Sequence, residues 1–224
     1  GKIQVIPLKG IRKTISQTLT KANTIEVPVT NFYDCDVTSL WDVRNKEKVK
    51  AQKKGVKLTF LPYIIKAVLE SMKEYPIINS SIENDEIIIK NYFNIGIAVA
   101  TTDGLIVPNI KDADKKSLYD LAKQIVDLAK KAQNRTLKLE EMKDGTFTIT
   151  NLGSIGVKYF TPMLNYPEAA ILGLGKIEER AIVENGKIVI KKILPLSITY
   201  DHRSVDGATA SKFMLSVMKS LESY

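Results

Sequence analysis

Near its C-terminal end the sequence places a strand, a short polar loop and a helix in immediate succession, and this order limits the fold more than any other segment. Residues 193–199 form an apolar run typical of a strand, and 208–221 repeat apolar side chains at helical spacing. The loop between them, 200–207, holds the only histidine of the 224 residues. We therefore expect His202 at a strand-to-helix junction, on a loop that a rigid scaffold can aim.

This histidine and the aspartate four residues after it form an H-x-x-x-D-G pattern. Histidine is the usual side chain for moving protons near neutral pH, because its unperturbed pKa is about 6.5. Asp206 is close enough in sequence to orient the imidazole or the loop around it. Two interpretations fit: His202 is a catalytic base, or it is a polar loop residue without a catalytic role. Short motifs occur often by chance, so the rest of the chain has to decide.

The composition is that of a globular protein that can bury one substantial core, with 44% hydrophobic and 26% charged residues. The net charge is +8, but only five of the 33 basic residues are arginines and the lysines are scattered. We therefore expect no nucleic-acid partner. No apolar run reaches the roughly 18 residues of a membrane span, and no signal peptide is present. With a single cysteine, these features favour a cytoplasmic protein without membrane contact.

The remaining chain changes repeatedly between helical and strand patterns. Apolar residues at helical spacing predict helices over 11–19, 38–54, 61–72 and 118–128. Asp36 or Thr38, Thr59 and Ser117 are the candidate caps for the last three of these helices. Strand patterns cover 25–33, 86–89, 94–100, 104–110 and the hairpin 182–190, whose centre Asn185-Gly186 is a type I′ turn signal.

The stretch 145–153 reads G-T-F-T-I-T-N-L-G and is the second chemically informative segment. Threonines at every second position alternate with Phe147 and Ile149, which predicts a half-buried strand. It ends in a glycine-bearing loop that would let a substrate approach. Taken alone, a threonine in a strand usually reflects β-propensity and no more.

Four motifs together resemble the catalytic domain of the dihydrolipoamide acyltransferases, the core components of the 2-oxo acid dehydrogenase complexes. They are D-H-R-x-x-D-G at 201–207, N-I-G-I-A-V-A-T-x-D-G-L-I-V-P at 94–108, G-T-F-T-I-T-N-L-G at 145–153 and F-T-P-M-L-N-Y-P-E at 160–168. They occur in the family's order, and the resemblance extends from about Pro7 to the last helix. The looser H-x-x-x-D-G also marks the chloramphenicol acetyltransferases, which resemble this family in fold.

The resemblance implies an α/β fold: a two-layer sandwich with a mixed β-sheet, chloramphenicol acetyltransferase-like and trimeric. It implies one catalytic domain over 1–224, with the family's lipoyl and subunit-binding domains upstream of it. Through those domains the partners would be the 2-oxo acid dehydrogenase and dihydrolipoamide dehydrogenase. Trimers of the family build cages through an apolar C-terminal tail. This chain ends in the more polar 221–224, so we expect a homotrimer and leave a larger cage open.

The implied reaction is acyl transfer between a dihydrolipoyl thiol, carried on a separate domain, and coenzyme A. His202 would act as general base. Thr150 stands where the family has a serine whose hydroxyl stabilises the oxyanion, and it keeps the hydroxyl. Asp206 would orient the loop or pair with an arginine, for which Arg12 is the candidate by analogy with the chloramphenicol enzymes. The sequence assigns no individual coenzyme A contact and no metal ligand, although the positive charge would attract that polyanion.

Several alternatives stay open at this level. The chain could be an O-acetyltransferase of the chloramphenicol type, or a scaffold without catalysis. Cys35 offers a route through an acyl-cysteine, but Asp34 and Asp36 beside it would raise its pKa and blunt it. Arg203 is interpreted as structural, and the role of Asp201 is undecided. The transferred group is acetyl or a branched-chain acyl group.

Overall fold

The centre of the fold is β9 (Ala170–Leu174), whose five residues are all buried. A strand covered on both faces has no solvent side, so its sequence is apolar throughout instead of alternating. In the computed structural model, which describes residues 1–224, β8 (Phe147–Asn151) runs parallel to β9 on one side. On the other side β11 (Lys187–Asp201) runs antiparallel to it. Thr150 therefore lies on one of the three central strands, β8, and His202 directly follows another, β11.

The full sheet has seven strands in the order β1-β11-β9-β8-β4-β7, with β10 paired to β11. Its parallel pairs are β4–β8 and β8–β9, and its other pairs are antiparallel, so the sheet is mixed as predicted. The remaining strands of this sheet are β1 (Pro28–Asp36), β4 (Ile95–Ile97), β7 (Asn109–Ile110) and β10 (Glu178–Glu184). Two separate hairpins pair β2 (Ser80–Glu83) with β3 (Glu86–Ile89), and β5 (Val99–Thr101) with β6 (Gly104–Ile106).

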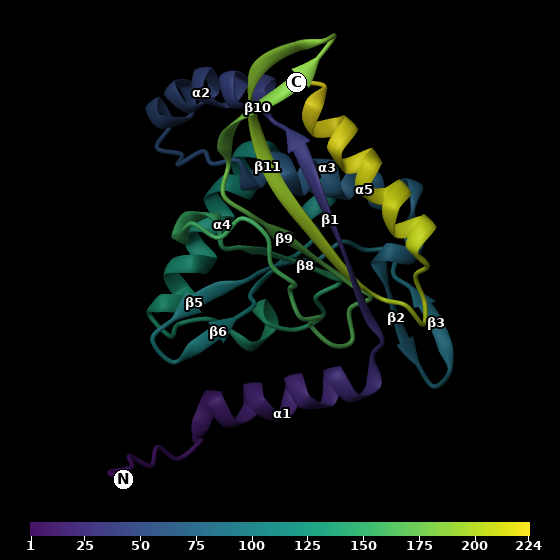
Figure 1. The fold of residues 1–224 in the computed structure, drawn as a ribbon. Helices are drawn as coiled ribbons and strands as arrows, with labels where there is room; N and C mark the ends of the chain where they lie inside the picture. Colours follow the sequence, from purple (N-terminus) through teal and green to yellow (C-terminus); the bar gives the residue numbers. More distant parts are fainter.

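Helices form the second layer. α3 (Leu61–Glu74) packs between α4 (Leu118–Gln133) and α5 (Gly207–Glu222), and the three cover one face of the sheet (Figure 1). α3 buries nine of its fourteen residues, because its apolar side chains recur at helical spacing over more than one face. α2 (Thr38–Lys53) lies beside β11 and α5. Four short 3-10 helices span Pro76–Asn79, Ala113–Lys115, Leu139–Glu141 and Gly153–Ile155.

The N-terminal segment differs from the rest of the subunit. α1 (Gly10–Ile25) runs apart from the sheet (Figure 1), and only Ala22 among its residues is buried. It approaches the body through Ile11 and Ile15, which lie against Gly104 at the start of β6, beside the hairpin turn. The residues before it are exposed, including Ile3, Val5, Ile6 and Leu8. This segment therefore presents apolar surface that a single subunit does not cover.

Three predicted strand boundaries were wrong. The strand expected over 25–33 begins only at Pro28, because α1 continues to Ile25 and a proline ends a helix at the residues before it. The strand expected over 94–100 divides into β4, in the main sheet, and β5, in a hairpin. The strand expected over 104–110 divides at Pro108, which has no N–H to offer to a ladder.

One predicted cap, Ser117, and the predicted Asn185-Gly186 turn are confirmed. The side chain of Ser117 accepts a hydrogen bond from the Asp120 N–H and caps α4. Asn185 and Gly186 have φ angles of 52° and 75°, as a type I′ turn requires. The Asp36 carboxylate accepts from the Thr38 N–H at 2.9 Å where α2 begins. The predicted Thr59 cap was wrong: α3 has no side-chain cap, and Pro62 in its first turn leaves one N–H fewer to satisfy.

Candidate active site

His202 follows the last residue of β11, and its imidazole is exposed. Its backbone is held firmly. The His202 N–H donates to the Val27 carbonyl at 2.8 Å, and the N–H of Asp201 donates to the Ala169 carbonyl at 2.9 Å. The ring of Tyr200 lies 5.8 Å from the imidazole, measured between centroids. The backbone of His202 is therefore fixed, while its side chain is exposed at the surface of the subunit.

The buried side chain of Asp201 holds this loop in place. Its carboxylate is 3% exposed and accepts hydrogen bonds from the Val27 N–H at 3.2 Å and from Nε of Arg203 at 2.9 Å. Burial raises the pKa of Asp201, but the bonds from Arg203 and Val27 outweigh it and hold that pKa below its ordinary value. Arg203 is thus structural, as predicted. Asp201 fixes the backbone on both sides of His202 and makes no hydrogen bond to the imidazole.

Asp206 caps α5. Its carboxylate is exposed and accepts from the Thr209 N–H at 2.7 Å. This backbone bond is the main cause that lowers the pKa of Asp206, and the charge of His202 is a smaller one. Within the subunit Asp206 forms no ion pair with Arg12 or with another arginine, and it does not bond to the imidazole. The geometry shows a helix cap, and the catalytic role of Asp206 stays a prediction.

Thr150 is half-buried on β8, opposite Gly173 of β9. A Cβ at Gly173 would lie 2.5 Å from Oγ of Ser197 and 2.8 Å from the ring of Phe160. The glycine therefore lets these two side chains close over the sheet beside Thr150. Asn151 then turns the chain, since its side-chain oxygen accepts from the Gly153 N–H at 2.9 Å. The hydroxyl of Thr150 is thereby placed on a rigid strand next to small and polar neighbours.

Thr150 and His202 do not meet within one subunit. Thr150 pairs with Gly173, Gly173 pairs with Ser197 on β11, and His202 lies five residues beyond Ser197. With about 4.8 Å between strands and about 3.3 Å per residue, their Cα atoms are roughly 19 Å apart. A base and an oxyanion donor must both reach one reacting centre within about 3 Å. The two side chains can cooperate only if they come from different copies of the chain.

Cys35 does not suit nucleophilic chemistry. Its side chain is fully buried. Burial is the main cause that raises the pKa of this thiol far above its ordinary value, and Glu222 and Asp36 raise it further. Because the thiolate is the reactive form, the acyl-cysteine alternative has no support in the structure.

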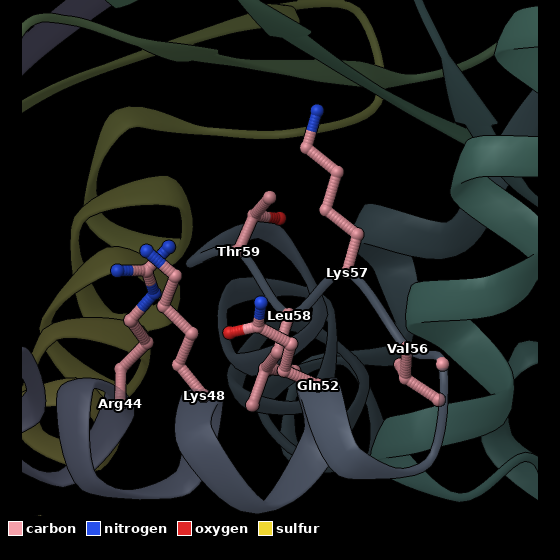
Figure 2. A pocket seen from close by; sticks show the side chains of 8 residues that line it. Arg44, Lys48, Gln52, Val56, Lys57, Leu58 and Thr59 are labelled. Atoms are coloured by element: carbon pink, nitrogen blue, oxygen red, sulfur yellow. The ribbon is translucent and has the colours of Figure 1, made fainter.

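A cationic cavity lies between α2 and the segment that leads into α3, with a volume of about 500 Å³ (Figure 2). Arg44, Lys48 and Lys57 line it, together with Gln52 and Thr59. The Arg44 guanidinium stacks 5.1 Å from the ring centroid of Phe60, and its buried Nε has no partner. None of the sequence motifs includes these residues. The available signal was the pair Arg44 and Lys48, one turn apart on the same helix face.

Two buried carboxyl groups near the loop also went unnoticed in the sequence. Glu26, 7% exposed, directly precedes the Val27 that bonds to His202. Burial, with the nearby charge of Asp201, raises the pKa of Glu26 to about 7. Glu168 is 2% exposed, and burial raises its pKa to about 7 as well. The signal for Glu168 was an acid directly before an apolar run.

No group of three or more histidine, cysteine, aspartate or glutamate side chains is arranged to hold a metal ion. No helix combines the length and apolar composition that a membrane crossing needs.

The subunit is an α/β sandwich, a mixed sheet with helices on one face and an exposed histidine directly after its longest strand, β11. A solved chloramphenicol acetyltransferase superposes with a TM-score of 0.56 over 97% of this chain and 99% of its own, at 17% identity, which shows the shared fold alone. The family model of the 2-oxoacid dehydrogenases acyltransferase (catalytic domain) matches residues 1–224. The chain belongs to this family, as its motifs predicted.

The relatives agree with this assignment. The dihydrolipoyllysine-residue acetyltransferase component of the pyruvate dehydrogenase complex from Bacillus subtilis is 44% identical over 216 residues, which is 96% of this chain and 49% of the relative. The chain thus spans about half the length of that relative. A crystal structure of Azotobacter vinelandii dihydrolipoamide acetyltransferase has a TM-score of 0.97 at 39% identity, over 99% of this chain and 92% of its own. The cubic core of a pyruvate dehydrogenase multienzyme complex reaches 0.96 at 38% identity, with the same coverage.

Proposed function

We propose that this domain transfers an acetyl group between coenzyme A and a dihydrolipoyl thiol, with His202 as general base and Thr150 as oxyanion donor. In the Azotobacter vinelandii enzyme a serine, a histidine and an asparagine have been investigated for their role in the catalytic mechanism. That histidine follows the serine by 52 residues and precedes the asparagine by four, and the same spacings separate Thr150, His202 and Asp206. This correspondence, on a near-identical fold, carries the proposal.

The chemistry follows from the two side chains. A thiol with a pKa near 8.5 is mostly protonated at neutral pH, so neutral His202 takes its proton as the sulfur attacks the thioester carbonyl. The carbonyl oxygen becomes an oxyanion, and the Thr150 hydroxyl donates a hydrogen bond to it. When the intermediate collapses, the other sulfur leaves as a thiolate and His202 returns the proton to it. Because donor and acceptor are both thiols, the same groups serve both directions.

The separation of roughly 19 Å between His202 and Thr150 supports a homotrimer whose subunits share each site. The exposed apolar residues of the N-terminal segment, including Ile3, Val5 and Ile6, are suited to cover a second copy. We extend the proposal to a cage built from such trimers. Its other partners are lipoyl domains that present the thiol, the 2-oxo acid dehydrogenase and dihydrolipoamide dehydrogenase.

The cationic cavity of Figure 2 suits the phosphates of coenzyme A. None of Arg44, Lys48 and Lys57 forms an ion pair, so their charge is available to an anion. Arg44→Gln with Lys48→Gln should raise the KM for acetyl-coenzyme A about tenfold and leave kcat unchanged, since these groups bind ground and transition states alike. Lys50→Gln is the matched control, because Lys50 is on the same helix and pairs with Glu47 instead.

The identity of the reaction is tested by acetyl transfer from acetyl-coenzyme A. Transfer to dihydrolipoamide and not to chloramphenicol supports the proposal. Transfer to chloramphenicol would indicate an O-acetyltransferase, and transfer to neither would indicate a scaffold. Isobutyryl-coenzyme A, offered as a competing donor, distinguishes the acetyl enzyme from a branched-chain one.

The shared site is tested by subunit exchange. His202→Ala and Thr150→Val should each be nearly inactive alone. When they are unfolded, mixed in equal amounts and refolded, about a quarter of the interfaces in random trimers pair an intact His202 with an intact Thr150. The mixture should therefore regain about a quarter of the native activity. A mixture that stays as inactive as its components would mean that each site lies within one subunit.

A further inference from the structure

Glu168 is a carboxyl group buried at the start of β9 without a cation in contact. It is 2% exposed and forms no ion pair, and Lys90 acts on it only at longer range. An ionised carboxylate in such a place has no charge to offset the cost of leaving water. The surroundings therefore favour the neutral acid, which carries one O–H donor besides its acceptors.

The hydrogen-bond partners of Glu168 leave room for that donor. Oγ1 of Thr148 donates to Oε2 at 2.6 Å, and Nδ2 of Asn165 donates to Oε1 at 2.8 Å. A third neighbour, Asn109, is buried, and its Oδ1 has no partner. A Cβ built on Gly145 would lie 2.7 Å from Oε1 of Glu168 and 2.6 Å from Oδ1 of Asn109. Both oxygens thus border the small space that the glycine keeps open.

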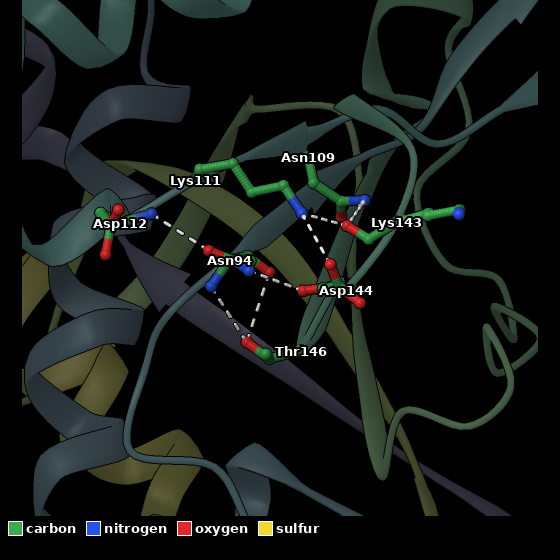
Figure 3. A network of polar contacts seen from close by, with 7 residues as sticks. All are labelled: Asn94, Asn109, Lys111, Asp112, Lys143, Asp144 and Thr146. Atoms are coloured by element: carbon green, nitrogen blue, oxygen red, sulfur yellow. Dashed lines mark hydrogen bonds and ion pairs between the residues drawn. The ribbon is translucent and has the colours of Figure 1, made fainter. Parts of the chain in front are cut away.

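The orientation of Asn109 follows from its other contacts. Figure 3 shows its Nδ2 directed at the carbonyl of Lys143, to which it donates at 3.3 Å. The amide oxygen is therefore the atom left facing Gly145 and Glu168. Oδ1 of Asn109 lacks a donor, whereas Oε1 of Glu168 already accepts from Asn165. A proton on Oε1 of Glu168 would supply the donor that Oδ1 of Asn109 lacks.

We propose that Glu168 is protonated in the active protein, donates to Oδ1 of Asn109, and is a positioning residue that locks the strand of Thr150 to the strand that supports His202. Thr148, which holds Oε2, lies two residues before Thr150 on the same face of β8. Glu168 itself directly precedes Ala169, whose carbonyl accepts the Asp201 N–H. Glu168 thus links the strand that carries Thr150 to the strand that supports the His202 loop. This positioning role rests on the proposed function.

The charges around Glu168 decide when the proton leaves. Burial raises its pKa to about 7, against the lowering effect of the Thr148 and Asn165 bonds and of Lys90, while Glu26 raises it further. Lys111, Lys143 and Asp144 lie around Asn109, and Lys111 and Asp144 form an ion pair at 3.9 Å (Figure 3). Above neutral pH the carboxylate form appears, and the bond to Asn109 turns into a repulsion between two acceptors.

The pH dependence of kcat for Glu168→Gln tests the positioning role. Glutamine keeps a donor and an acceptor at every pH, and Asn165 can turn its amide to suit the new donor. Near pH 6 the variant should keep native kcat within about threefold. Above pH 7 native kcat should fall about tenfold per pH unit, as for a single ionisation, while the variant stays level. KM should not change in either protein. Parallel alkaline limbs would overturn the proposal.

A second variant and a spectroscopic readout keep the test independent of that one substitution. Thr148→Val removes a donor that favours the ionised form, so the alkaline limb should move to higher pH. The infrared band of a protonated carboxylic acid, assigned by its absence in Glu168→Gln, should be present at pH 6 and lost by pH 8.5. Its absence at pH 6 would overturn the proposal. Failure of both proteins to transfer acetyl at any pH would contradict the proposed function, and the infrared band would still decide the protonation.

Discussion

His202 and Thr150 are held at the two ends of one sheet by opposite means. The imidazole is exposed, and only its backbone is fixed, by the carbonyl of Val27 just before β1 and by the buried Asp201, whose carboxylate also holds Arg203. Thr150 is half-buried on β8, whose neighbours β4 and β9 both run parallel to it, and it lies opposite Gly173. A buried carboxylate and backbone bonds therefore hold the His202 end, and a central strand holds Thr150.

This difference matches what each step of the chemistry needs. A base that takes a proton from a thiol and later returns it must be free to reach two sulfur atoms in turn. An oxyanion donor is most effective when it is already oriented and has nothing to rearrange, which a central strand provides. One sheet holds these two side chains only far apart, so the proposed chemistry needs a second copy of the chain to bring them together.

The largest effect on activity is expected from His202→Ala, which removes the proposed base at the exposed end of the sheet. Loss of the general base should lower kcat roughly 10³-fold. The fold should be unaffected, because the side chain is exposed and its structural contacts are made by the backbone. Stopped assays with acetyl-coenzyme A and dihydrolipoamide measure the rate, and far-ultraviolet circular dichroism checks the fold. Activity within tenfold of native in a folded variant would remove His202 from the mechanism.

Thr150→Val tests the other end with a nearly equal shape. Without the hydroxyl, kcat should fall about 10²- to 10³-fold, the loss typical of one oxyanion donor. Thr150→Ser keeps the hydroxyl and should stay within about tenfold of native, since it removes only a methyl and frees the rotamer. The unfolding midpoint of both variants reports whether packing changed. A valine variant as active as the serine variant would contradict the assignment.

Glu26→Gln tests the charge at the His202 end through stability. The folded-state pKa of Glu26, about 7, lies above the value near 4.3 of an unfolded chain. The folded state therefore binds this proton more tightly, and the stability it contributes is complete below about pH 4.3 and lost as pH rises through 7.

Glutamine removes that loss. The variant should equal native protein near pH 4 and exceed it by about 1 to 3 kcal/mol in unfolding free energy at pH 8. Urea unfolding at several pH values measures the difference. Glu140→Gln, at an exposed glutamate, is the control and should leave the pH dependence unchanged. A constant offset at every pH would show that ionisation of Glu26 is not the cause.

The limits of sequence-based prediction differ between elements for physical reasons. Local signals were sufficient for three helices and one turn. A helical period or a cap marks α3, α4 and α5, and a turn dipeptide marks Asn185-Gly186. The segment 94–110 alternates as a strand does, but alternation does not say which sheet a strand joins. β4 joined the main sheet because of β8, a partner from a distant segment, whereas β5 paired locally with β6 in a hairpin.

The site divides in the same way. His202 and Thr150 each lie in a short continuous sequence motif, which can be recognised without the structure. The cationic cavity, Glu26 and Glu168 owe their character to burial and to neighbours from distant segments, such as Lys57 for Arg44 and Asn109 for Glu168. Neither burial nor such neighbours can be read from a local pattern. Asp206 shows the converse, since its motif suggested chemistry while its contacts are those of a helix cap.

Asp206 therefore gives the smallest and most specific test of what holds the His202 end. If it acts as a cap, Asp206→Ala should lower the unfolding midpoint by roughly 2 to 4 °C and leave kcat within about threefold. Asp206→Asn should match native protein in both, because asparagine caps helices as well and occurs at this spacing in the Azotobacter vinelandii enzyme. Calorimetry and the transfer assay measure the two effects. A large loss of kcat in the alanine variant without a loss of stability would instead show that Asp206 takes part in catalysis.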